Sequence, residues 1–75
     1  MNKYLANRLR TLRKAHGFTQ QQAADILKID RSTLAYYESG RIEPPLRILE
    51  KLRVLYHTTY NDLLEYLSWS NPPNY

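Results

Sequence analysis

The sequence predicts a compact all-α domain of five helices, and three observations support that prediction. Leucines recur with helical spacing, as in Leu5, Leu9 and Leu12. Residues suited to starting and ending helices, such as Thr19 and Gly40, separate the apolar stretches. No stretch alternates apolar and polar residues as a half-buried strand would. The chain has 75 residues, and we expect residues 1–67 to fold as one domain, with residues 68–75 as a C-terminal tail.

Caps define the first three predicted helices. The first helix is expected over residues 4–16 and ends before Gly17. The second is expected over residues 20–27, because Thr19 and Gln22 have the spacing of a capping box. The third is expected over residues 31–38, between an N-cap at Asp30 and a stop at Gly40. The second and third helices are too short to be stable alone, so the other helices must hold them.

Two further helices complete the prediction. The fourth is expected over residues 45–56 and carries two apolar stripes. We expect the first stripe to face the core; it contains Leu46, Leu49, Leu52 and Tyr56. The second, partial stripe of Ile48 and Leu55 gives the helix more apolar surface than one contact with the core requires. The fifth helix is expected over residues 60–67 after a cap at Thr59, with its leucines in the core.

Composition narrows the classes of function. The net charge is +4, and the first 14 residues contain five basic residues and no acidic one. Such a basic pole suits a polyanion, although a basic helix is also often a solvated face. The chain has no cysteine, no apolar run of membrane-spanning length and no signal-peptide core at its start, so we expect a cytoplasmic protein. His16 and His57 are isolated, and no phosphate loop or metal-binding spacing occurs, so we expect no enzyme, cofactor or metal.

The middle of the chain has the arrangement of a helix-turn-helix. Its two caps, Thr19 and Asp30, lie eleven residues apart, with small alanines in the first helix and polar residues on the outer face of the second. The chain resembles the Cro/C1-type (XRE-like) helix-turn-helix family of phage repressors and bacterial regulators. The matching residues include Leu9, Leu12, Arg13, Gly17, Phe18, Thr19, Gln20, Ala24, Leu27, Ile29, Arg31, Ser32, Thr33, Leu34, Glu38, Gly40, Pro44, Leu49, Leu63 and Leu64. The resemblance covers residues 5–64 and implies a lambda-repressor-like domain that binds double-stranded DNA.

The resemblance also implies roles for individual residues. The expected base-reading residues are Arg31, Ser32, Ala35 and Tyr36. The expected phosphate-binding residues are Thr19, Gln20, Thr33, Ser39 and Arg41. Arginine can donate two hydrogen bonds to guanine, and an alanine can contact a thymine methyl group. Two alternatives stay open, since Arg31 also suits a solvated helix start and Tyr36 can lie across the surface beside Tyr37.

Other matches concern the scaffold. Arg13 and Glu38 match a pair that forms a buried salt bridge in some family members, and we expect it to lock the reading helix in place. Lys28 stands where the family usually has glycine, so a residue with a Cβ is expected at positive φ. His57 and Thr58 replace a usual Gly-Val pair, which leaves the geometry of that turn open.

These observations predict a sequence-specific DNA-binding transcriptional regulator, a repressor that binds a pseudo-palindromic operator as a homodimer. The same fold also serves antitoxins and protein-interaction adaptors. The residues that could form a surface for a second copy or another protein are Ile48, Leu55, Tyr66 and Trp69. The simpler interpretation, which we favour, is that the tail covers its own core and the extra stripe forms a homodimer.

Overall fold

The computed structural model describes residues 3–64, and within that range the chain is all-α with no strand. Its five helices are α1 (Lys3–Ala15), α2 (Gln20–Leu27), α3 (Arg31–Ser39), α4 (Leu46–Leu55) and α5 (Tyr60–Leu63). The predicted fold class is therefore confirmed. None of these helices has the length and apolar character needed to cross a membrane.

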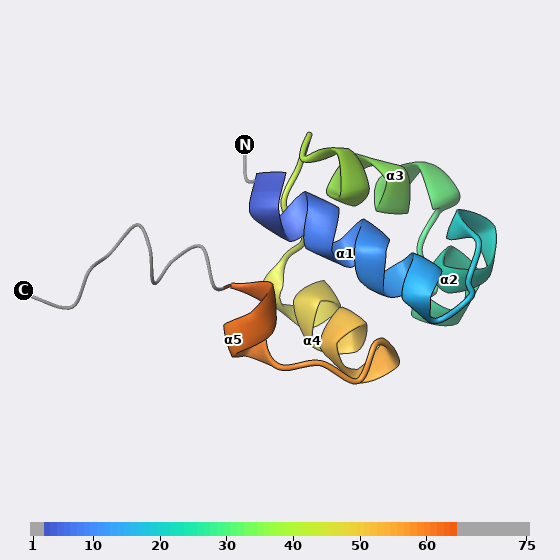
Figure 1. The fold of residues 1–75 in the computed structure, drawn as a ribbon. Coiled ribbons are helices and arrows are strands. Elements are labelled where there is room, and N and C mark those ends of the chain that lie inside the picture. Colours follow the sequence, from blue (N-terminus) through green and yellow to red (C-terminus); the bar gives the residue numbers. More distant parts are fainter. Residues whose placement is uncertain (1–2, 65–75) are drawn as a thin grey trace, which may run out of the picture.

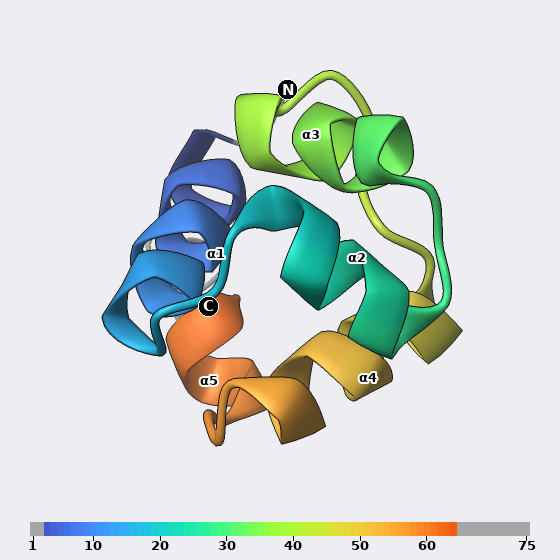
Figure 2. The same cartoon turned by 90° about the vertical axis from the view of Figure 1, so that its right-hand side faces the viewer.

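The helices enclose one core between them. The first helix, α1, packs against α3 on one side and α5 on the other, and α2 packs against α3 and α4 (Figures 1 and 2). The residues buried in this core are Leu5, Leu9, Ala23, Ala24, Leu27, Leu34, Tyr37, Ile48, Leu49, Leu52, Tyr56 and Leu63. Since every helix contributes, the two short helices α2 and α3 are held by the packing of α1, α4 and α5 around them.

The fourth helix is rotated relative to its prediction. Leu46, which we expected in the core, is 73% exposed, whereas Ile48, which we assigned to a partner surface, is 2% exposed. The buried stripe runs through Ile48, Leu49 and Leu52 to Tyr56. At 3.6 residues per turn, Leu46 lies about 120° around the axis from Leu52, the fully buried centre of this stripe. Leu49, Leu52 and Tyr56 of the predicted core stripe are therefore confirmed, and the prediction was wrong at Leu46 and Ile48, where tertiary packing turned the edge of the stripe.

The helix ends follow most of the predicted caps. The Thr19 side chain accepts a hydrogen bond from the Gln22 amide, and the Gln22 side chain accepts one from the Thr19 amide, so the capping box forms. Gly40 adopts the left-handed conformation that ends α3. Asp30 occupies the N-cap position of α3, but its side chain makes no capping hydrogen bond. Lys28 has φ 62° and His57 has φ 52°, so both turns place a residue with a Cβ at positive φ.

Asp62 anchors α5 to α1. Its carboxylate accepts hydrogen bonds from Arg8 Nε at 3.0 Å and from the Thr58 hydroxyl at 2.6 Å, and its carbonyl accepts one from the Tyr4 hydroxyl at 2.7 Å. The helix itself ends at Leu63, followed by a turn at Leu64, so its predicted extent was too long, and residues 65–67 lie outside the described residues.

Replacing Lys28 with glycine is expected to stabilise the domain. Left-handed backbone costs a residue with a Cβ roughly 1–2 kcal/mol, and glycine avoids that cost while losing about 0.5–1 kcal/mol of chain entropy. We expect Lys28→Gly to raise the free energy of unfolding by about 1 kcal/mol and the melting temperature by several degrees, measured by circular dichroism. The control is Lys28→Ala, which removes the charge but keeps the Cβ and should give no such gain. A lower melting temperature for the glycine variant would contradict the strain argument.

The hydrogen-bonded ion pair between Asp62 and Arg8 is expected to stop stabilising the domain in acid. Burial raises the pKa of Asp62, but hydrogen bonds from Thr58 and Arg8 and the charge of Arg8 outweigh it, so the pKa is lowered overall. The stabilisation is therefore present above the unfolded-state pKa of about 3.9 and disappears as the pH falls through the lower folded-state value. Because the ion pair is partly exposed, Asp62→Asn should cost about 1 kcal/mol or less at neutral pH.

Urea unfolding of both proteins across acidic and neutral pH measures this difference. The two stabilities should converge in acid, whereas Glu43→Gln, at an exposed carboxylate, should match the parent chain throughout. A gap between Asp62→Asn and the parent that persisted unchanged in strong acid would exclude the ionised anchor.

Candidate nucleic-acid interface

A buried ion pair joins α1 to the end of α3. Arg13 Nε lies 2.7 Å from Glu38 Oε2, and Arg13 Nη2 lies 3.1 Å from Glu38 Oε1. The two side chains are 9% and 2% exposed, as predicted for a structural pair. Arg13 Nη1 also donates to the carbonyl of Phe18 at 2.7 Å, which ties in the turn between α1 and α2. The hydrogen bond to Glu38 raises the pKa of Arg13.

Gln20 connects this ion pair to the surface. Its Nε2 donates to Glu38 Oε1 at 3.1 Å, and its Oε1 accepts from Arg31 Nη1 at 3.3 Å. The carboxylate can only accept and the guanidinium can only donate, so the two neighbours determine which way the amide points. A continuous chain of hydrogen bonds therefore runs from buried Arg13 through Glu38 and Gln20 to exposed Arg31. Sequence analysis placed Gln20 and Arg31 on one face but did not predict this connection.

The outer face of α3 carries the residues expected to read bases. Arg31, Ser32 and Tyr36 are exposed, and Ala35 is half-buried beside them. The opposite face of the helix is buried through Leu34, Tyr37 and Glu38. This division leaves one side of α3 exposed. The helix itself lies along the upper edge of the molecule in Figure 1. The Arg41 guanidinium stacks over the Tyr36 ring, 5.2 Å from the ring centre.

The expected phosphate-binding residues surround this face, with one exception. Thr19 and Gln20 lie at the start of α2, and Ser39 and Arg41 at the end of α3. Gln20 keeps a second amide N–H for a phosphate oxygen, since only one is used by Glu38. Thr33 lies on the other flank of α3, where it lines a shallow depression with Asp30 and Arg47.

Lys3 is a further basic residue beside the end of α3, and in the sequence it was only one of the five basic residues among the first 14. Its Nζ donates to the Ser39 carbonyl at 3.0 Å, where it complements the negative end of the α3 dipole. It also lies against Gly40, where its Cδ is 3.4 Å from the position that a Cβ would take. The contact joins positions 36 residues apart, so no local pattern could have indicated it.

The predicted partner surface is only partly present. Ile48 belongs to the core, so its assignment to a partner surface was wrong. Leu55 is half-buried and packs against the core. Tyr66 and Trp69 lie outside the described residues. Within residues 3–64, no three His, Cys, Asp or Glu side chains gather in a way that could hold a metal ion.

Two short helices that are joined by a turn and packed against each other, with a polar outer face on the second, define a helix-turn-helix protein. Comparison with protein families agrees, because the helix-turn-helix domain family matches residues 5–67. The chain belongs to that family.

The chain is also similar to proteins that are named as transcriptional regulators or repressors in a bacterium, a phage and an archaeon. The chain is 45% identical over 58 residues to the HTH-type transcriptional regulator AnsR of Bacillus subtilis (strain 168), covering 77% of this chain and 50% of AnsR. It is 35% identical over 49 residues to Repressor protein C of Escherichia phage P2, covering 65% of this chain and 50% of the repressor. An uncharacterized HTH-type transcriptional regulator of Archaeoglobus fulgidus is 29% identical over 59 residues, covering 79% of this chain and 84% of that protein. The chain thus spans about half the length of the Bacillus and phage relatives.

Removing one partner of the buried ion pair is expected to destabilise the domain strongly. Glu38→Ala would leave Arg13 charged and without its carboxylate, a change that typically costs about 3–5 kcal/mol. Thermal and urea unfolding measure this loss. The matched control is Glu50→Ala, which breaks the exposed pair with Arg53 and should change the melting temperature little. Equal melting temperatures for Glu38→Ala and the parent chain would rule out a structural role for the pair.

Proposed function

We propose that this chain is a sequence-specific DNA-binding transcriptional regulator that inserts α3 into the major groove. The observation behind the proposal is the hydrogen-bond chain that ends on Arg31 at the exposed start of α3. The major groove admits one α-helix, and the first residues of a reading helix reach base edges. Arg31 is held by Gln20, and it forms no ion pair with a carboxylate of residues 3–64. Its guanidinium charge is therefore available to guanine O6 and N7.

The surrounding surface supports contact with a polyanion. Within residues 3–64, neither Arg10 nor Lys14 forms an ion pair, and both are exposed on α1. Arg8 is different, because it is paired with Asp62. Ser39 and Arg41 at one end of α3 and Thr19 and Gln20 near the other suit phosphates on either side of a groove. Together these groups supply non-specific attraction and fix the register of the reading helix.

The finer part of the proposal is a homodimeric repressor. The phage relative is named Repressor protein C, and two copies on a pseudo-palindromic operator would place half-sites about one helical turn, ~34–36 Å, apart. A small domain bound at a promoter can repress by occlusion. The antitoxin and adaptor alternatives also need a protein-binding surface. The burial of Ile48 removes it from the surface expected for a second copy and for another protein alike, so it does not separate these alternatives from the homodimer.

Base preference after mutation of Arg31 tests the reading role. An operator is first selected from random oligonucleotides with the intact chain, and binding is then measured to that operator and to single base-pair variants. Arg31→Ala should abolish discrimination at one guanine position, a loss of about 1–3 kcal/mol, or roughly 5- to 150-fold. It should leave discrimination at the other positions largely intact.

The matched control is Arg10→Ala, which removes the same charge from α1. That variant should weaken binding to every sequence alike and reduce the dependence of affinity on salt concentration. If Arg31→Ala behaved in the same way, lowering affinity equally for all sequences, its base-reading role would be excluded. Failure to enrich any sequence in the selection would favour the adaptor alternative.

A further inference from the structure

A shallow apolar groove lies between α4 and α5, away from α3. It is lined by Pro45, Leu46, Arg47, Glu50, Tyr60 and Leu64 and has a volume of about 810 Å³. Figure 1 shows α4 and α5 side by side, on the opposite side of α1 from α3. The groove therefore belongs to neither the proposed DNA-binding face nor the buried core.

Among the large hydrophobic side chains that line this groove, Leu46 is the most exposed. It is 73% exposed, and Tyr60 on the facing helix is 38% exposed. Burying apolar surface is worth about 25 cal/mol per Å², so this exposed leucine and its neighbours favour an apolar occupant. Scattered exposed leucines are ordinary, but here the leucine forms one wall of a groove with Pro45 and Leu64.

The groove has two charged side chains, Glu50 and Arg47, and within residues 3–64 only Glu50 has a charged partner. Glu50 is occupied, since it accepts hydrogen bonds from Arg53 and from the Tyr60 hydroxyl. Arg53 in turn stacks over the Tyr60 ring, 5.2 Å from its centre. Arg47 has no ion pair within residues 3–64. An occupant that suits this groove is apolar or aromatic and has a negative charge at one end.

The chain itself continues from the wall of the groove with a segment of that composition. Leu64 is the last described residue, and it is followed by Glu65, Tyr66, Leu67, Ser68 and Trp69. Glu65 is the only charged side chain in residues 65–75. At ~3.3–3.6 Å per residue, five residues from Leu64 to Trp69 reach about 17 Å, enough to fold back over Leu46 and Tyr60. A short tether also raises the local concentration of the segment to the millimolar range.

We propose that residues 65–69 of this chain bind in the α4–α5 groove, with Trp69 against Leu46 and Glu65 toward Arg47. The proposal does not depend on DNA binding. It assigns the tail the role of covering the apolar edge that the rotation of α4 leaves open. The tether favours the tail of the same chain over a free partner of equal affinity.

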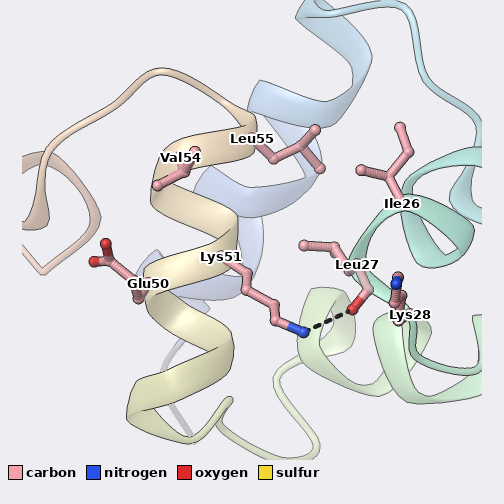
Figure 3. A pocket seen from close by; sticks show the side chains of 7 residues that line it. All are labelled: Ile26, Leu27, Lys28, Glu50, Lys51, Val54 and Leu55. Atoms are coloured by element: carbon pink, nitrogen blue, oxygen red, sulfur yellow. Dashed lines mark hydrogen bonds between the residues drawn. The ribbon is translucent and has the colours of Figure 1, made fainter.

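A second groove of the domain provides a control position for the experiment. It lies between α2 and α4 and is lined by Ile26, Leu27, Lys28, Glu50, Lys51, Val54 and Leu55 (Figure 3). In Figure 3, Lys51 crosses it to the Leu27 carbonyl, to which its Nζ donates at 3.4 Å. Val54 is 56% exposed on the same helix as Leu46, but it does not line the groove between α4 and α5. Val54 therefore serves as a matched control position.

Trp69 is the only tryptophan in the chain, so its fluorescence reports on the tail alone. In the intact chain we expect emission at shorter wavelength than in the urea-unfolded chain, at every protein concentration. Leu46→Asp should shift the emission toward that of the unfolded chain and increase acrylamide quenching severalfold. Leu46→Gln, which adds no charge, should act in the same direction, and Val54→Asp should leave the emission unchanged. Since both leucine variants alter an exposed residue, circular dichroism should show the same helix content as the parent.

Three results would overturn the proposal. One is an emission in the folded chain equal to that of the unfolded chain, because the tail would then be in water. Another is a shift that grows only as protein concentration rises, which would assign the groove to a second copy. The third is a buried Trp69 that does not respond to Leu46→Asp, since the tail would then bind elsewhere.

Discussion

The ion pair between Arg13 and Glu38 is the interaction on which the rest of the structure depends. Two charges removed from water are costly unless each is fully hydrogen-bonded, and here Glu38 accepts from both Arg13 and Gln20 while Arg13 also holds the Phe18 carbonyl. The pair joins α1, the turn that follows it, the start of α2 and the end of α3. Neither α2 nor α3 is long enough to hold its own place, so this polar contact complements the apolar core in positioning them.

The same ion pair also orients side chains at the exposed start of α3. Glu38 accepts a hydrogen bond from the Gln20 amide nitrogen, and the Gln20 amide oxygen then accepts one from Arg31. A side chain that is held before binding loses less conformational freedom on binding than a free one. Stability and recognition are therefore coupled in one network, and a change in the core at Glu38 is transmitted to the exposed start of α3.

The fourth helix shows how packing on one side creates a surface on another. Because Ile48 and Leu52 turn inward against the core, Leu46 is left outward beside α5. The domain thus has two separate exposed regions, a polar one on α3 and an apolar one on α4. The helices that carry them, α3 and α4, lie on opposite sides of α1 (Figure 1).

The sequence by itself determined the local features of this protein. Helix ends depend on residues a few positions apart, so the capping box at Thr19 and the stop at Gly40 were predictable, and the resemblance to a known family indicated the Arg13–Glu38 pair. Only the tertiary structure decided that Ile48 and not Leu46 is buried, how Gln20 joins Arg31 to the ion pair, and that Arg8 holds Asp62 across 54 positions. These features depend on which side chains meet across helices, and helical periodicity does not contain that information.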